Sequence, residues 1–178
     1  MSDLQQLRFP IGKYERPSSL PLDDDARAAL IRDIERAPGA LRAVVTGLSD
    51  AQLDTPYRPG GWTIRQVVHH VPDSHMNGYT RMKLAMTEDS PTIKLYHEAL
   101  WAELPEARTA PVDVSLDLLD ALHFRWTAFL RALTPVDFQR PYIHPDLGLV
   151  PIDVAIGIYA WHGKHHTAHI TSALRRPA

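Results

Sequence analysis

The chain has 178 residues, 44% of them hydrophobic, which suits one ordinary domain with a single core. Its 19 basic and 21 acidic residues give a formal charge of -2, and no Lys/Arg-rich block could follow a phosphate backbone, so we expect no nucleic-acid partner. The absence of cysteine excludes disulfides, thiolate metal ligands and a cysteine nucleophile.

The sequence also lacks the features of export and of membrane insertion. The N-terminal segment MSDLQQLRFPIGKYERP has no apolar signal-peptide core, and no stretch approaches the roughly 18 apolar residues that span a bilayer. We therefore expect a cytoplasmic protein with no membrane partner.

The first half of the chain predicts an arm and two helices. Residues 1–22 contain three prolines and no sustained periodicity, so we expect an extended arm in front of a bundle domain that covers residues 23–178. The acidic run 23–25 begins the first helix, in which apolar residues repeat at helical spacing and Pro38 predicts a bend. Thr63 and Gln66 have the spacing of a capping box and begin the second helix, which should reach about Met86 with a kink at Pro72.

The second half predicts a short helix and two more long ones. The short helix is TIKLYHEALWAEL, and the third long helix is SLDLLDALHFRWTAFLRAL, with a buried stripe of leucines. Asp153 is the expected N-cap of the last helix, which ends near Arg175 and Arg176. We find no convincing strand pair. An all-α four-helix bundle is the natural way to bury four apolar stripes.

The last helix carries four histidines on one face. They lie at offsets of zero, three, four and seven, within about one third of the helix circumference: His162, His165, His166 and His169. Two imidazoles four residues apart can bind one metal ion, and both 162/166 and 165/169 have this spacing. Because the neighbouring residues are apolar, histidines without a ligand would carry a desolvation cost here. The spacing predicts a metal site without choosing between the pairs, and a solvated histidine-rich face is the alternative.

The second helix carries a polar stripe at the same four offsets. Its members are His70, Asp73, Ser74 and Asn77. His69 and His75 are expected to point elsewhere. A polar stripe inside an apolar helix is what a site in a bundle interior requires, so we expect the two stripes to face each other.

Other histidines and arginines have simpler explanations. His97, His123 and His144 each stand alone in their segments and are interpreted first as ordinary core or surface residues. Arg81 and Arg125 are interpreted first as surface or salt-bridge residues.

Several segments, in order along nearly the whole chain, resemble the YfiT branch of the DinB superfamily. They are FPIGKYERP, LDTPYRPGGW, GGWTIRQVVHHVPDSHMNGYTRMK, TEDSPTIKLY, YIHPD and WHGKHHTAHI. The resemblance implies an up-down-down-up bundle, a homodimer and one divalent ion, zinc or nickel. It implies His70, His165 and His169 as the metal ligands, and Pro72 departs from the family pattern.

Three neutral ligands leave a coordination position open, which is typical of a catalytic metal. Our first hypothesis comes from the resemblance, which extends to relatives that transfer thiols such as bacillithiol. It is a bacillithiol-type S-transferase, in which the ion binds a thiol cosubstrate as thiolate for transfer to a small-molecule electrophile. The motif HHTAH supports it, because the glutamate of HExxH hydrolases is missing. The second hypothesis is a hydrolase that uses metal-bound water. The third is a non-catalytic metal-binding module, in which His162 or His144 would close the coordination shell.

The catalytic residues predicted around the metal are Asp73, Asn77 and His144. Asp73 or Asn77 would orient a ligand or a bound water from outside the coordination shell. Asp73, His144 or Asp146 could supply a general base. Arg81 or Arg125 could bind an anionic group of the substrate.

Overall fold

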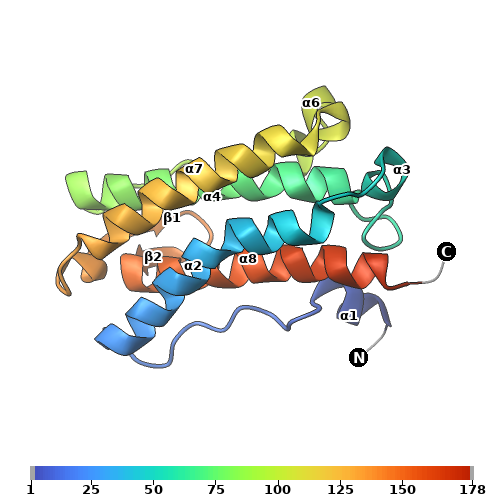
Figure 1. The fold of residues 1–178 in the computed structure, drawn as a ribbon. Helices are drawn as coiled ribbons and strands as arrows, with labels where there is room; N and C mark the ends of the chain where they lie inside the picture. The colour runs from blue at the N-terminus through green and yellow to red at the C-terminus, as the bar shows by residue number, and fades with distance from the viewer. Residues whose placement is uncertain (1–2, 177–178) are drawn as a thin grey trace.

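Four long helices form an elongated bundle in the computed structural model, which describes residues 3–176 (Figure 1). They are α2 (Asp24–Val45), α4 (Ile64–Thr87), α7 (Val112–Arg131) and α8 (Ile152–Leu174). The predicted four-helix bundle is confirmed. Among the described residues, no helix is long and apolar enough to cross a bilayer.

Short elements precede and connect the long helices. They are α1 (Asp3–Arg8), α3 (Asp50–Leu53), α5 (Glu98–Trp101), α6 (Pro105–Thr109), the 3-10 helix η1 (Asp137–Gln139), β1 (Pro141–His144) and β2 (Gly148–Pro151). Helix α2 packs beside α8 and α7, and α4 packs beside the same two helices. In Figure 1, α2 and α8 run in one direction and α4 and α7 in the other. This is the up-down-down-up order.

The start of α4 follows from its sequence. Thr63 Oγ1 accepts a hydrogen bond from the Gln66 backbone N–H at 3.1 Å, and the Gln66 side chain accepts one from the Thr63 N–H at 2.9 Å. These two bonds satisfy backbone donors that a helix start leaves free, so the predicted capping box is present. Pro72 lies inside α4, and the helix continues past it. The cap fixes where α4 begins, and His70 lies two turns after this point.

A β-hairpin precedes α8, where the sequence indicated no strand pair. Strands β1 and β2 are antiparallel, with Tyr142 opposite Val150. The segment predicted as a short helix is mostly irregular. Ile93 N–H donates to the Ile143 carbonyl at 3.0 Å, and only α5 within it is helical. Four-residue strands are too short to show a periodicity that separates them from loops.

Asp153 is not the N-cap of α8, which is Pro151. Its carboxylate is fully buried and accepts hydrogen bonds from the Arg27 guanidinium at 2.8 and 3.2 Å, from the Leu22 N–H at 3.0 Å and from the Gln139 side chain at 2.8 Å. Asp153, whose residue type favours a helix N-cap, therefore forms a buried ion pair with Arg27 instead. It joins the arm, α2, η1 and α8 at one point.

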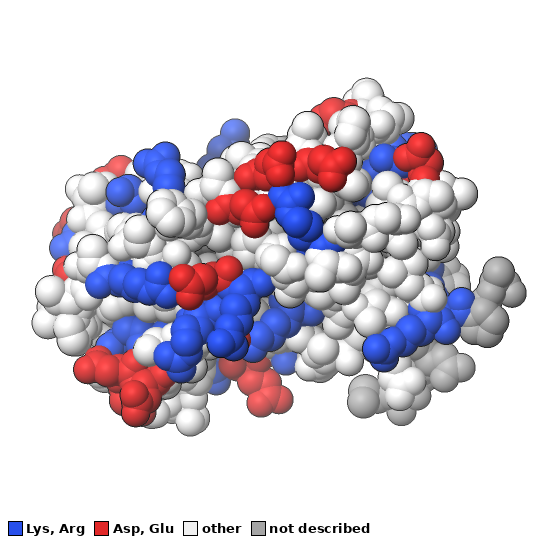
Figure 2. All heavy atoms as spheres, in the orientation of Figure 1, with Lys and Arg blue, Asp and Glu red and all other residues white. Residues whose placement is uncertain are grey.

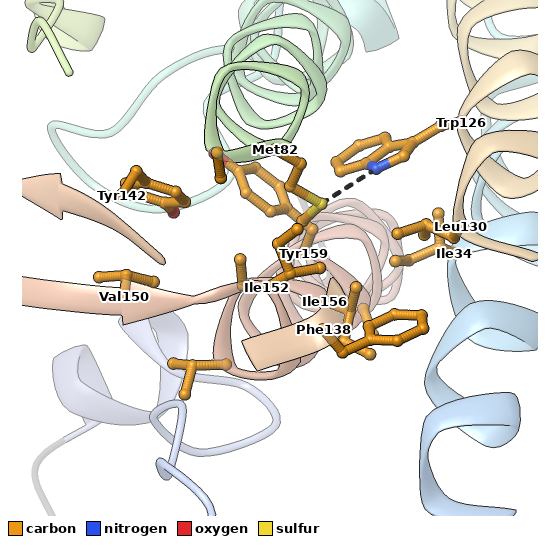
Figure 3. Close-up of a cluster of buried hydrophobic side chains, with 14 of the residues drawn as sticks. Ile34, Met82, Trp126, Leu130, Phe138, Tyr142, Val150, Ile152, Ile156 and Tyr159 are labelled. Atoms are coloured by element: carbon orange, nitrogen blue, oxygen red, sulfur yellow. Dashed lines mark hydrogen bonds between the residues drawn. The ribbon is translucent and has the colours of Figure 1, made fainter. Parts of the chain in front are cut away.

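Two apolar clusters fill the bundle, one toward each end. The first surrounds Tyr159 beside the hairpin, where Trp126 Nε1–H points at Met82 Sδ at 3.3 Å (Figure 3). The second contains Leu41, Val67, Leu116, Leu119 and Ile170. In α7 and α8 the buried histidines lie between the residues of the two clusters. In α4 this holds for His75, whereas His69 and His70 lie next to Val71 of the second cluster.

The arm follows α8 along the outside of the bundle (Figure 1). Tyr14 donates to the Val154 carbonyl at 3.2 Å, and Trp161 Nε1–H donates to the Gly12 carbonyl at 3.3 Å. Part of the predicted arm is helical, as α1. Figure 2 shows basic and acidic side chains interspersed over one face of the molecule.

The buried ion pair gives a first prediction. Replacing Asp153 by Ala should lower the free energy of unfolding by about 3–5 kcal/mol, because it leaves the buried Arg27 charge without its main partner. Asp24→Ala is the matched control: Asp24 pairs with the same guanidinium, but its side chain is 86% exposed, so the loss should stay below about 1 kcal/mol. Urea unfolding measures both variants, and equal losses would contradict the assignment.

Candidate metal centre

A layer of histidines crosses the bundle between the two apolar clusters. Helices α4, α7 and α8 supply it, with His70, His75, His123, His162, His165, His166 and His169. All are buried except His162, which is partly exposed. Of the predicted α4 stripe, His70 meets the histidine face of α8.

Three of these rings converge: His70, His162 and His166. One ring nitrogen from each lies within 4.8 Å of the other two, and His70 Nε2 is 3.3 Å from His162 Nε2. Nitrogen ligands at about 2.0–2.1 Å from a tetrahedral zinc ion lie roughly 3.3 Å apart. The donor set and its spacing fit a divalent ion.

The ligand set implied by the family resemblance is not the one that converges. His165 stacks on Trp161 with ring centroids 4.2 Å apart, and its Nδ1 is buried without a hydrogen-bond partner among the described residues. His169 Nε2–H donates to the Arg8 carbonyl at 3.1 Å, and its ring packs on Tyr57. Within the part of the chain that the structure describes, His70, His162 and His166 are the group that could hold an ion.

The rotation of α8 about its axis decides between the two pairs. Pairs 162/166 and 165/169 have identical spacing and lie about 60° apart around the helix. The bundle turns the first pair toward His70, while the second meets the arm and the loop that contains Tyr57. Spacing alone could not distinguish them.

Burial keeps the converging imidazoles in the form that binds metals. It lowers the pKa of His70 to about 4, and it holds the pKa values of His162 and His166 well below 6.5, with the neighbouring histidines lowering them further. A neutral imidazole has a free lone pair, so no proton has to be displaced at neutral pH.

A cavity of about 480 Å³ reaches the histidine group at His166. Its wall comes from the arm, the loop before α4 and the start of α5, and includes Arg8, Tyr57, Arg58, Trp62 and Glu98. Neither Arg8 nor Arg58 forms an ion pair within the described residues. Two guanidiniums that form no ion pair, beside this histidine group, favour an anionic ligand.

Asp73, Asn77 and His144 lie outside the converging group. Asp73 is partly buried, which raises the pKa of its carboxyl to about 6, with a further contribution from the negative charge of Glu106. Asn77 donates its side-chain N–H to the Asp73 backbone carbonyl at 2.9 Å. His144 Nδ1 accepts the Asp146 N–H at 3.2 Å and so closes the hairpin turn. Among the described residues, none of these three side chains is hydrogen-bonded to the converging histidines, so their catalytic roles stay predictions.

The two predicted anion-binding arginines do not line this cavity. Arg81 lies 3.5 Å from the Tyr159 hydroxyl and from the Lys94 carbonyl, and Arg125 is exposed on α7. The cavity residues that sequence reasoning missed, Arg8, Arg58 and Glu98, come from segments without a regular periodicity. The one signal for this wall was the segment LDTPYRPGGW, which was quoted for the family resemblance and contains Tyr57, Arg58 and Trp62.

His75 was expected to point away, but it faces the interior. Its ring is hydrogen-bonded to His162 at 3.0 Å and to His123 at 2.7 Å. His123, interpreted as an isolated core residue, is thus part of the same layer. His69 does point elsewhere, toward Ser115 and the Ala110 carbonyl.

The lowered pKa values predict that the metal-free protein loses stability in acid. Burial lowers the pKa of His123 from 6.5 to about 4, so the unfolded chain takes up that proton first as the pH falls. His123 alone then costs about 3 kcal/mol between pH 6.5 and 4. Asp73 has the opposite effect on stability: because its pKa is raised, its protonation in acid favours the folded state. It is one group, however, against several histidines that favour the unfolded state in acid.

Urea unfolding of the metal-free protein measures this effect. The free energy of unfolding should fall between about pH 6.5 and pH 4, where the histidines of the unfolded chain are protonated and the buried ones are still neutral. A constant value over this range would show that the buried imidazoles are not neutral in the folded state.

Comparison with known proteins agrees with this fold. Residues 33–170 match the family model of the DinB superfamily. A protein of Bacillus mycoides is 51% identical over 97% of this chain and 98% of its own length, and one of Bacillus cereus is 53% identical over the same shares. Both carry the name "putative metal-dependent hydrolase".

Two solved structures are similar. YfiT from Bacillus subtilis, described as a probable metal-dependent hydrolase with an unusual four-helix bundle topology, superposes with a TM-score of 0.93 at 47% identity, covering 96% of this chain and 97% of YfiT. TT2238, a four-helix bundle protein, has a TM-score of 0.55 at 20% identity, covers 79% of this chain and 94% of its own, and shows the fold alone. The resemblance to the YfiT branch is confirmed, and the chain belongs to the DinB superfamily.

Proposed function

We propose that this protein is a metal-dependent enzyme whose divalent ion is held by His70, His162 and His166. The observation that carries the proposal is the convergence of three neutral imidazoles at the end of a cavity. A bound ion would act as a Lewis acid on whatever occupies its remaining coordination position. Imidazole ligands suit zinc and nickel, which are the two ions we propose.

The protein side chains around the cavity would bind and orient the substrate. Arg8 and Arg58 lie on its wall and would hold an anionic group, such as a carboxylate, through charge-assisted hydrogen bonds. Arg58 is already oriented, because its guanidinium donates to the Tyr57 hydroxyl at 3.0 Å and to the Pro59 carbonyl at 3.1 Å. We therefore propose a small anionic molecule as substrate.

Hydrolysis is the reaction we propose first. The relatives from Bacillus are named as metal-dependent hydrolases, and Glu98 lines the same cavity as His166. A carboxylate there could accept a proton from water as a general base. The missing glutamate in HHTAH therefore does not count against hydrolysis, because α5 brings a carboxylate to the cavity from another part of the chain.

Transfer of a low-molecular-weight thiol, of the bacillithiol type, is the second candidate. The basic wall of the cavity favours it, because a thiol cosubstrate that carries carboxylates would find Arg8 and Arg58 there. A non-catalytic metal-binding module is less well supported. Of its two predicted fourth ligands, His144 closes the hairpin turn and His162 is itself one of the three converging histidines. A homodimer stays a prediction of the family resemblance.

The ligand assignment is tested by metal content. His162→Ala should lose the bound ion, because it removes one of three converging nitrogens, whereas His165→Ala should keep a near-stoichiometric ion, because His165 faces Trp161. Elemental analysis of untagged protein, refolded with zinc or nickel, measures both. Loss of the ion in His165→Ala alone would restore the ligand set implied by the resemblance and reject ours.

The reaction is tested with paired panels of substrates. Esters and amides, each in a carboxylated and a neutral form, are compared with thiol and electrophile pairs. Glu98→Gln should lower hydrolysis by roughly 10²–10⁴-fold if the carboxylate is the general base, and should leave thiol transfer within a few-fold. Carboxylated compounds should show the lower KM. An unchanged hydrolytic rate in Glu98→Gln would remove Glu98 from the mechanism.

A further inference from the structure

Two buried histidines outside the converging group form a hydrogen-bonded chain that ends on one of its members. His75 Nε2 lies 3.0 Å from His162 Nδ1, and His75 Nδ1 lies 2.7 Å from His123 Nε2. His123 Nδ1 is hydrogen-bonded to the backbone carbonyl of Ile34 in α2. The chain thus runs from α8 through α4 and α7 to α2, and both nitrogens of each ring have a partner.

The carbonyl group sets the direction of this chain, because it can only accept a hydrogen bond. His123 Nδ1 must carry the proton, and in a neutral imidazole the other nitrogen is then the acceptor. His75 therefore donates from Nδ1 and accepts at Nε2 from the Nδ1–H of His162. By the same rule, His162 Nε2 carries a lone pair, and this is the atom that lies 3.3 Å from His70 Nε2.

Within residues 3–176, the rings of His75 and His123 have no other hydrogen-bond partners. His75 is 0% and His123 is 2% exposed, and Trp126 and Tyr159 pack against His75 in T-shaped arrangements at centroid distances of 5.8 and 5.3 Å. Gly163 lies close by: a Cβ there would be 3.0 Å from the Ala37 Cβ and 3.7 Å from the His75 ring. Rings buried this deeply depend on each other for their hydrogen bonds.

The other converging histidine of α8 has a shorter chain of the same kind. His169 donates its Nε2–H to the Arg8 carbonyl, so its Nδ1 is the acceptor and lies 3.4 Å from His166 Nδ1. His166 then donates from Nδ1 and keeps a lone pair on Nε2. Both α8 members of the converging group are thus linked, through a further histidine, to a backbone carbonyl.

We propose that His75 and His123 are positioning residues that lock His162 in its Nδ1–H tautomer, so that its Nε2 lone pair is directed at the metal ion. This inference rests on the proposed metal site. In the other neutral tautomer, the proton would occupy the atom that has to bind the ion. Removing a hydrogen bond that orients a metal-binding histidine typically weakens metal binding by about 10–100-fold.

The test begins with His123→Leu, which removes the acceptor for His75 and allows both rings to adopt the other tautomer. The zinc Kd of the metal-free protein, measured by competition with a chromophoric chelator, should rise roughly 10–100-fold. His123→Gln should rescue it to within a few-fold, because Oε1 of glutamine can accept where Nε2 did. His69→Leu is the matched control, a buried histidine with two hydrogen bonds outside the chain, and should leave the Kd unchanged.

Long-range ¹H–¹⁵N NMR of the metal-free wild-type protein reads the tautomers directly and needs no variant to fold. Protons on Nδ1 of His162, His75 and His123 are expected. A proton on Nε2 of His162, or an unchanged Kd in folded His123→Leu, would overturn the proposal. Failure of the wild-type protein to bind zinc would instead reject the metal site, while the NMR result would still decide whether the chain sets the tautomer.

Discussion

Burying many imidazoles in an apolar bundle is the constraint on which the rest of this structure depends. An imidazole without a partner in such surroundings carries a large desolvation cost, so the rings must bond to each other, to backbone carbonyls or to a metal ion. The layer that contains His70, His75, His123 and the histidines of α8 meets this constraint by gathering in the middle of the helices. The two apolar clusters on either side hold the four helices around it.

The sequence was informative where one helix determines the outcome. The capping box at Thr63 and the shared face of the α8 histidines both follow from local spacing, and both are present. It was uninformative where the outcome depends on how elements meet: the rotation of α8 toward His70, the inward turn of His75, and the use of Asp153 as a partner for Arg27. Each of these depends on how the helices pack together, and the residue pattern within a single segment carries no information about that packing.

The candidate site combines two kinds of structure. The nitrogen atoms that would bind the ion come from α4 and α8, whose positions are fixed by packing along their whole length. The cavity wall comes from the arm, the loop that precedes α4, and α5, where Arg8, Arg58 and Glu98 lie. Rigid helices suit a site whose ligands need precise spacing, and irregular segments suit the contacts that select a substrate.

The up-down-down-up order has a consequence for how such a protein can diversify. Because α4 and α7 run in the same direction, the connection between them, residues 88–111, has to travel back along the bundle, and it carries part of the cavity wall on the way. This connection contributes few residues to the two cores. Substitutions and insertions there can change which molecule is bound without disturbing the histidines, so a lineage can acquire new chemistry on an unchanged metal scaffold.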